Sequence, residues 1–180
     1  MSLNQLIEKC KKNDTQAQSQ IYKLFANKLY SVCLKYSRNY AEAEDNLQDA
    51  FITIFKKICQ FKSKGSFEGW LRRVTVNTAL QRYRSPGVFD IVNEEQIEDV
   101  SVEIDDNAVS IDYLLQIIQE LPDRYRLVFN LYAMDDYPHK EIARMLNISI
   151  GTSKSNLARA RLILREKIET YKMNNNSQSL

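Results

Sequence analysis

Residues 137–165, YPHKEIARMLNISIGTSKSNLARARLILR, have the pattern of two helices joined by a tight turn. Pro138 suits the first turn of a helix, where its missing N–H would have no partner in any case. The first apolar stripe stops at Asn147, which tolerates the left-handed backbone conformation, and Ser149 is placed to cap the next helix through its hydroxyl. The stretch therefore predicts a helix-turn-helix, although an ordinary helical hairpin with a solvated polar face would share this pattern.

The second helix of this stretch is expected to present short polar and basic side chains on its outer face. In a DNA-binding helix-turn-helix, the start of the second helix enters the major groove, where such side chains meet base edges and phosphates. We favour DNA binding over a solvated hairpin because this face is basic and is not mixed in charge. The residues predicted to contact duplex DNA are Thr152, Lys154, Ser155, Asn156 and Arg159.

Helix breakers are scarce along the whole chain, with four glycines and three prolines among 180 residues. Long segments without breakers predict an all-α protein. We expect a four-helix domain over residues 1–85, an acidic linker over 86–110, a helix-turn-helix domain over 111–173 and a disordered polar tail over 174–180. Because no apolar run is long enough to span a bilayer and the N-terminus lacks a signal peptide, we expect a cytoplasmic protein that is not embedded in a membrane.

The net charge of +2 conceals a strong asymmetry along the chain. Residues 56–84 carry 8 basic and 1 acidic side chains, and residues 137–180 carry 8 and 3. Between them, residues 86–123 carry 11 acidic and no basic side chains. Basic clusters on ordered helices indicate nucleic acid as the partner. Two basic modules therefore predict two separate nucleic-acid contacts.

The helix expected over residues 67–84 combines arginines with aromatic side chains. Cations follow phosphates and rings offer stacking surfaces for unpaired bases, so this combination suits single-stranded DNA. Phe67 and Trp70 can equally be core residues, and for Trp70 we favour the core. The cations predicted to meet a single strand, from this helix and the loop before it, are Lys62, Lys64, Arg72, Arg73 and Arg82.

The helix expected over residues 41–58 carries Asp45, Gln48 and Asp49 on the face opposite its apolar stripe. Carboxylates near a helix N-terminus are stabilised by the helix dipole, which explains them without any partner. The alternative is that this polar stripe docks on a basic helix of another protein.

Nothing in the sequence has the pattern of a catalytic site. There is no phosphate-binding glycine loop and no nucleophile motif, and the one histidine, His139, is expected on the surface. Cys10, Cys33 and Cys59 lack metal-ligand spacing and are expected to be buried thiols. We therefore expect no enzymatic activity, no cofactor and no metal.

Two separated stretches resemble one family, the extracytoplasmic-function (ECF) sigma factors. AEDNLQDAFITIFKKICQFKSKGSFEGWLRRVTVNTALQRYR, residues 43–84, resembles their region two, and LPDRYRLVFNLYAMDDYPHKEIARMLNISIGTSKSNLARARLILREKI, residues 121–168, resembles their region four. This resemblance implies a protein that binds core RNA polymerase, directs it to promoters and helps to open them. It also implies an anti-sigma factor as a partner, and an acidic linker that threads toward the active-site and RNA-exit channel of the polymerase.

The resemblance assigns roles to individual positions. Asp45, Gln48 and Asp49 match the family's AED-x-x-Q-[DE] motif on the helix that docks on the β′ coiled coil. The resemblance implies that core RNA polymerase is contacted through its β′ coiled coil and its β subunit. The residues expected to bind the polymerase are Asp45, Gln48, Asp49 and Ile52. Trp70, Arg73 and Asn77 match the pattern W-L-x-R-I-A-x-N. This match places Arg73 and Asn77 near the −10 strand, whereas the recognition helix of region four reads the −35 duplex.

Four positions depart from the family's usual residues: Gln81 for Asp, Asn147 for Gly, Ser153 for an apolar residue and Asn156 for Arg. Asn147 can supply the same backbone conformation, whereas Ser153 weakens the packing of the recognition helix slightly. Because asparagine pairs bidentately with adenine, Asn156 could shift the −35 preference. We hypothesise that Asn156→Arg strengthens duplex binding and reduces sequence choice.

Two other functions are compatible with parts of the pattern. A one-component regulator would use only the helix-turn-helix on closed duplex DNA, but it would have no need of the basic aromatic helix at residues 67–84. An anti-sigma factor or adaptor would use its basic helices to bind acidic partners. Tight palindromic duplex binding without polymerase would favour the regulator, and failure to bind any DNA with polymerase present would favour the anti-sigma factor or adaptor.

Overall fold

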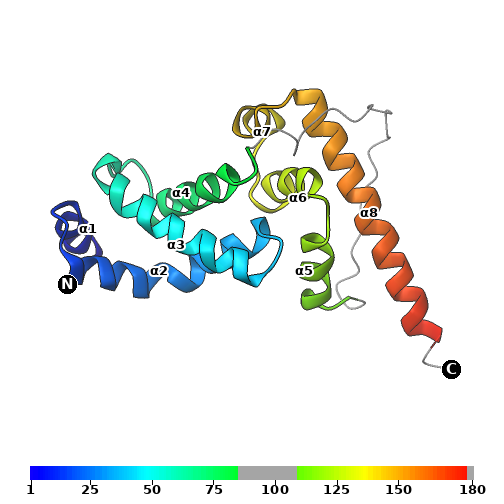
Figure 1. Ribbon diagram of the computed structural model, residues 1–180, viewed down its shortest axis with the longest axis horizontal. Helices are drawn as coiled ribbons and strands as arrows, with labels where there is room; N and C mark the ends of the chain where they lie inside the picture. Colours follow the sequence, from blue (N-terminus) through cyan, green and yellow to red (C-terminus); the bar gives the residue numbers. More distant parts are fainter. Residues whose placement is uncertain (85–108, 178–180) are drawn as a thin grey trace. The chain divides into compact units, whose positions relative to one another are not determined.

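A computed structural model of the chain describes residues 1–84 and 109–177 (Figure 1). Within these ranges every regular element is a helix, so the predicted all-α class is confirmed. The chain divides into two compact units, with the boundary between Arg82 and Tyr83. Each unit has its own helices and buried side chains, and each is described separately.

The acidic linker predicted for residues 86–110 lies outside the described residues except at its end. Val109 is 8% exposed and packs in the apolar cluster of the second unit. The Ser110 hydroxyl accepts a hydrogen bond from the backbone N–H of Tyr113 at 3.2 Å. These two residues therefore belong to the second helical unit and not to a linker, because one is packed and the other caps a helix.

The first unit consists of α1 (Leu3–Lys11), α2 (Thr15–Tyr36), α3 (Tyr40–Lys57), the 3-10 turn η1 (Ile58–Gln60) and α4 (Phe67–Gln81). Each α-helix begins after a capping side chain, which satisfies a backbone N–H that has no partner within the helix. The capping oxygens of Ser2, Asp14, Asn39 and Ser66 lie 3.3, 2.9, 2.8 and 3.0 Å from the backbone nitrogens they accept from. The four helices predicted for this domain are thus present.

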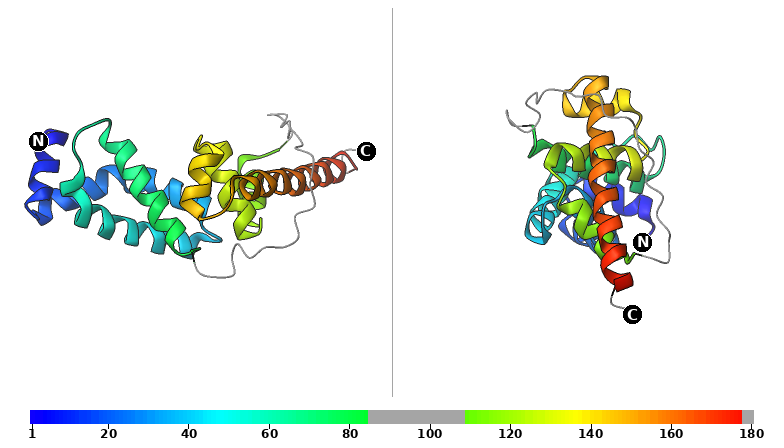
Figure 2. Two further views of the ribbon diagram at one scale, coloured as in Figure 1. Left: turned by 90° about the horizontal axis from the view of Figure 1, so that it is seen from above. Right: turned by 90° about the vertical axis from the view of Figure 1, so that its right-hand side faces the viewer.

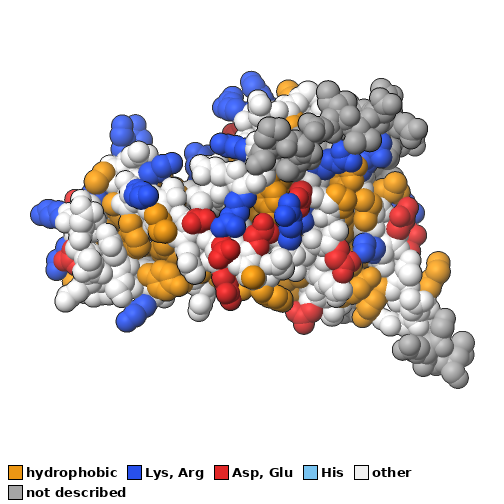
Figure 3. Space-filling view, in the orientation of Figure 1, with side chains coloured by type: hydrophobic (Ala, Val, Ile, Leu, Met, Phe, Trp, Pro, Cys, Tyr) orange, Lys and Arg blue, Asp and Glu red, His pale blue; other side chains and the backbone are white. Residues whose placement is uncertain are grey.

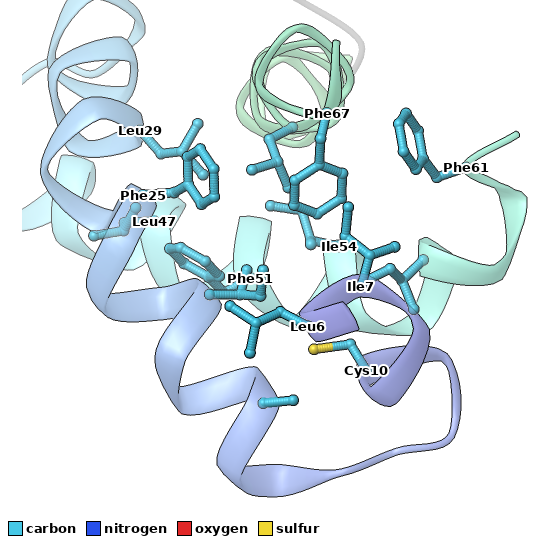
Figure 4. Packing of buried hydrophobic residues seen from close by; sticks show 14 of the residues in the cluster. Leu6, Ile7, Cys10, Phe25, Leu29, Leu47, Phe51, Ile54, Phe61 and Phe67 are labelled. Atoms are coloured by element: carbon cyan, nitrogen blue, oxygen red, sulfur yellow. The ribbon is translucent and has the colours of Figure 1, made fainter. Parts of the chain in front are cut away.

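Apolar side chains from all four helices meet in one core (Figure 4). Its buried members include Leu6, Ile7, Phe25, Leu29, Phe51, Ile54, Phe67 and Leu71. The rings of Phe25 and Phe67 meet edge to face, with centroids 5.7 Å apart, a favoured geometry for an aromatic pair. This burial holds α3 against α4 and so determines which faces of the two helices point to solvent.

The prediction of buried thiols is confirmed for two of the three cysteines. Cys10 and Cys33 are both 0% exposed, and burial raises the pKa of the Cys33 thiol to about 12. The prediction is wrong for Cys59, which is exposed. Cys59 lies in η1, where Ile58 supplies the buried side chain and its neighbour faces outward.

The second unit consists of α5 (Ile111–Gln119), α6 (Asp123–Phe129), the π-helical turn η2 (Asn130–Met134), α7 (His139–Leu146) and α8 (Ile150–Ser177). Its apolar cluster joins Ile117 and Leu121 to Leu164 and Ile168 of α8. A charged side chain, Arg126, is also buried here and is only 1% exposed. Its guanidinium donates hydrogen bonds to the Leu121 carbonyl at 3.0 Å and to Asp123 Oδ1 at 2.6 Å, so the buried charge is paired.

Helix α8 is a single uninterrupted helix (Figure 2) that continues to Ser177. The prediction of a disordered tail is therefore wrong for residues 174–177, and residues 178–180 lie outside the described part. After Gly151 the helix contains no glycine or proline that would end it. The stacked rings of Tyr113 and Tyr171, with centroids 4.1 Å apart, also hold α8 against α5 beyond the helix-turn-helix.

Candidate nucleic-acid and docking interfaces

The polar residues predicted to dock on a partner share one exposed face of α3. Asp45 and Asp49 keep 63% and 51% of their side-chain surface accessible, and Ile52 is 52% exposed. Gln48 is exposed as well, whereas the opposite face of α3 is buried. Figure 3 shows acidic side chains beside hydrophobic ones over α2 and α3. An exposed isoleucine among carboxylates is suited to a partner that is both basic and apolar.

Arg82, predicted to contact a single strand, is paired with this acidic face in the structure. Its Nη2 atom lies 2.8 Å from Asp49 Oδ2 and its Nη1 atom 3.8 Å from Asp45 Oδ2. The hydrogen bond to Asp49, with the nearby charges of Asp49, Asp45 and Glu42, raises the pKa of Arg82. The sequence analysis missed this pair because Arg82 and Asp49 are 33 residues apart and lie on different helices.

The other predicted strand-binding cations are open to solvent. Lys62 and Lys64 are exposed in the loop before α4, and Arg72 and Arg73 are exposed on α4 itself. Asn77, one turn further along α4, is half-buried. These side chains provide cations along one helix and the loop that leads into it, an arrangement suited to a negatively charged strand.

The aromatic side chains near this loop form a cluster of their own. Phe61 and Phe67 are 8% and 5% exposed, and their ring centroids lie 5.1 Å apart. Trp70 is half-buried and packs against the core, with its ring 5.6 Å from Phe61 and 5.8 Å from Phe67. Trp70 thus packs against the core as the sequence analysis favoured, while part of its side chain stays exposed, and Phe61 directly precedes Lys62 of the loop.

The predicted helix-turn-helix is present in α7 and α8. Asn147 ends α7 in the left-handed conformation, with φ 56° and ψ 47°. The Ser149 hydroxyl accepts a hydrogen bond from the Thr152 N–H at 2.9 Å and so caps α8. The backbone N–H of Ile148 donates to the Ala143 carbonyl at 3.0 Å, which closes the turn. The turn and both caps agree with the sequence analysis.

The predicted duplex-reading residues do not all face outward. Lys154 is exposed, and Thr152, Ser155 and Arg159 are half-buried. Asn156 is only 6% exposed, and its amide Nδ2 has no hydrogen-bond partner in the described part of the chain. The prediction that the Asn156 side chain faces outward is therefore wrong. It lies one turn after Ser153 and one turn before Ala160, so it shares their buried face.

Ser153 is completely buried, yet its hydroxyl has a partner. The Oγ atom lies 2.9 Å from Nδ1 of His139 on α7. The His139 ring stacks on Tyr132, with centroids 4.5 Å apart and 20° between the planes. The prediction that His139 lies on the surface is thus only partly right, because the ring is half-buried between two elements. The sequence signal for the Ser153–His139 pair was the presence of a polar residue, Ser153, within the apolar stripe of its helix.

The residues that the structure describes contain neither a candidate metal site nor a helix suited to span a membrane. No group of three or more His, Cys, Asp or Glu side chains among them could hold a metal ion. None of the helices they form combines the length and apolar character needed to cross a membrane.

The two units match two family models. Residues 21–87 match Sigma-70 region 2, and residues 111–164 match Sigma-70 region 4. The ECF RNA polymerase sigma factor SigW of Bacillus subtilis is 31% identical over 182 residues, which cover 93% of this chain and 97% of that protein. The ECF RNA polymerase sigma-E factor of Escherichia coli strain K12 is 27% identical over 178 residues, 91% of this chain and 93% of that protein.

A solved structure has a related fold. It is the co-crystal structure of the sigma factor RpoE with the anti-sigma factor NepR from Bartonella quintana. The alignment covers 84% of this chain and 96% of that chain, with a TM-score of 0.53 and 22% identity. At this identity the likeness concerns the fold alone.

Proposed function

The chain belongs to the ECF family of RNA polymerase sigma factors, and from that premise we propose how its two helical units divide promoter recognition between them. The predicted family resemblance of residues 43–84 and 121–168 is confirmed by the region 2 and region 4 matches. The chain is therefore a promoter-recognising subunit of RNA polymerase, and sigma factors are initiation factors without catalytic chemistry. A regulator that uses only the helix-turn-helix is not favoured, because the region 2 match covers the first unit as well.

The first part of the proposal is that the exposed face of α3 docks on the β′ coiled coil of core polymerase. Asp45, Gln48 and Asp49 would form polar contacts, and Ile52 would be covered by the partner. The observation that carries the proposal is the exposure of Ile52, 52% accessible beside two carboxylates. One exposed isoleucine is ordinary on a protein surface, so its support for docking comes from its place beside Asp45, Gln48 and Asp49, the positions that match the family's docking motif.

The second part concerns the −10 element. Lys62, Lys64, Arg72 and Arg73 would contact the phosphates of the opened strand, and Asn77 would lie close to it. Their exposure, in a loop and on the helix that follows, supports this assignment. The aromatic cluster beneath the loop would keep its lysines in place during strand capture.

The third part concerns the −35 element, which the start of α8 would read in the major groove. Lys154, Thr152, Ser155 and Arg159 remain candidates because they are exposed or half-buried. Asn156 is not proposed again as a base contact, since its side chain is buried. An anti-sigma factor is a further proposed partner, by analogy with RpoE, which was crystallised with NepR.

Comigration with core RNA polymerase tests the docking assignment. Size-exclusion chromatography would compare the wild type with Asp45→Arg/Asp49→Arg, which reverses two charges of the docking face. Glu166→Arg/Glu169→Arg is a matched control, because both glutamates are exposed on α8 and the charge change is the same. Loss of comigration in the first variant alone supports the docking face. Equal comigration of both variants would show that core polymerase binds another surface of the protein. Absence of comigration for the wild type would contradict the proposal.

A further inference from the structure

We propose that Arg82 is an internal counter-ion of the docking face, that core polymerase displaces it, and that the freed side chain then adds a cation to the strand-binding helix α4. The inference rests on the proposed docking role of Asp45 and Asp49. It links the two surfaces of the first unit through one side chain, so that polymerase binding and strand binding favour each other.

The position of Arg82 determines what it can reach. It is the C-cap of α4, where its backbone N–H is bonded to the carbonyls of Ala79 and Leu80. The packing of α4 on α3 places the guanidinium over the acidic face, 2.8 Å from Asp49 and 3.8 Å from Asp45. Arg82 thus belongs to the strand-binding helix by its backbone and to the docking face by its side chain.

The pair is accessible enough to be exchanged. The Arg82 side chain is 35% exposed, and the carboxylates are 63% and 51% exposed. An exposed ion pair contributes only about 0.2–1 kcal/mol. A basic side chain of the partner can therefore replace Arg82 at Asp49 with little loss, because one weak ion pair is exchanged for another.

Release of Arg82 changes the charge available to DNA. Arg72 and Arg73 are exposed on the same helix. Arg82 lies ten residues after Arg72, so the two are roughly 15 Å apart along the helix axis. While Arg82 is paired, its charge is offset by Asp45 and Asp49. Once it is released, the helix presents one more cation at its C-terminal end, within reach of a further phosphate.

Equilibrium titration with core RNA polymerase tests the competition. Fluorescence anisotropy of the full-length protein, labelled at its N-terminus, would give Kd for the wild type, Arg82→Gln, Asp45→Asn/Asp49→Asn and the triple variant. We expect Arg82→Gln to bind about two- to fivefold tighter than the wild type, the range that an exposed ion pair allows. In the Asp45→Asn/Asp49→Asn background, the same change is expected to leave Kd unaltered, because there is no carboxylate left to release.

The outcomes separate the inference from its premise. Weaker binding of Asp45→Asn/Asp49→Asn together with unchanged or weaker binding of Arg82→Gln overturns the counter-ion role while the docking assignment stands. Unchanged binding of Asp45→Asn/Asp49→Asn overturns the docking assignment and the inference with it. Circular dichroism of each variant shows whether the helices are retained, so that loss of folding is not taken for loss of docking.

The release step has its own readout in single-strand binding. Anisotropy of fluorescein-labelled oligo(dT) would be measured with the full-length protein between about 50 and 200 mM salt. Freeing Arg82 through Asp45→Asn/Asp49→Asn is expected to steepen the slope of log K against log salt by about 0.7, the value for one additional phosphate contact on a single strand. The triple variant is expected to return to the wild-type slope. A gain that persists in the triple variant arises from the lost carboxylates and overturns the release step.

Discussion

The Nδ1 atom of His139 lies 2.9 Å from the Oγ atom of Ser153, and this contact joins the two helices of the helix-turn-helix. Ser153 is completely buried in α8, at a position where the family usually has an apolar residue. A buried hydroxyl without a partner would destabilise the unit, so the histidine from α7 compensates for the polar residue in the stripe. The pair explains how this chain keeps the motif despite its departure at residue 153.

We expect His139→Ala to lower the free energy of unfolding of the second unit by about 1–3 kcal/mol, because it leaves the Ser153 hydroxyl unsatisfied. The double variant His139→Ala/Ser153→Ala should lose less than the sum of the two single variants. Urea denaturation of the four proteins gives this double-mutant cycle. Strict additivity would show that the contact contributes nothing to the packing of α7 on α8.

In the recognition helix, Lys154→Ala is expected to weaken DNA binding, whereas Asn156→Leu is not. The first removes an exposed cation, so duplex affinity should fall and the salt slope should decrease by about 0.9. The second replaces a buried, unpartnered amide with an apolar side chain of similar size and should leave duplex affinity unchanged at each salt concentration. A salt titration on promoter-like duplex DNA compares them, and a loss of affinity for a folded Asn156→Leu variant would contradict the burial of this residue.

The burial of Asn156 also revises the expectation for Asn156→Arg. An arginine at this position would have to bury its charge or leave the packed face, so the variant should unfold more easily and not simply bind DNA more tightly. Thermal unfolding monitored by circular dichroism checks this. A variant as stable as the wild type, with tighter duplex binding, would restore the hypothesis drawn from the sequence.

Arg126→Met should destabilise the second unit by about 2–4 kcal/mol, because the carbonyl of Leu121 and the carboxylate of Asp123 lose a buried donor. Arg124→Met is the matched control. Its guanidinium is half-buried over the ring of Tyr125, 4.8 Å from the centroid, and its loss should cost less than about 1 kcal/mol. Chemical denaturation distinguishes the two, and equal losses would contradict a special role for the buried arginine.

Thiol reactivity should reflect the burial of the cysteines. Burial raises the pKa of the Cys33 thiol to about 12, so almost no thiolate forms there near pH 8, and burial also raises the pKa of the Cys10 thiol. Cys59 is exposed and should react with a thiol reagent in the native protein. A colorimetric thiol titration should therefore detect one group in buffer and all three in denaturant, and the Cys59→Ser variant should lose the native signal.

Much of the architecture could be predicted because its causes are local. Ser66 caps α4 and Ser149 caps α8 through bonds to backbone atoms three residues away. Asn147 ends α7 by its own backbone conformation. Spacing along a helix also placed Asp45, Gln48 and Asp49 on one face, because their directions depend only on the helical period.

Other predictions failed where a local pattern was too weak to decide. The tail was expected to be disordered, yet α8 runs to Ser177, because no breaker ends it and Tyr171 stacks on Tyr113 of another helix. Asn156 was placed outside because it is polar. Its neighbours Ser153 and Ala160 show that it shares the face that α8 buries.

The sequence by itself determined the helices, their caps, the turn between α7 and α8 and the membership of the sigma factor family, since each depends on residues that are close along the chain or on a motif of fixed spacing. Only the tertiary structure decided the partners of long side chains. Arg82 reaches Asp49 across 33 residues, and His139 reaches Ser153 across 14. Such contacts depend on how one helix packs against another, because a guanidinium or an imidazole pairs with whatever the packed core brings within about 3 Å.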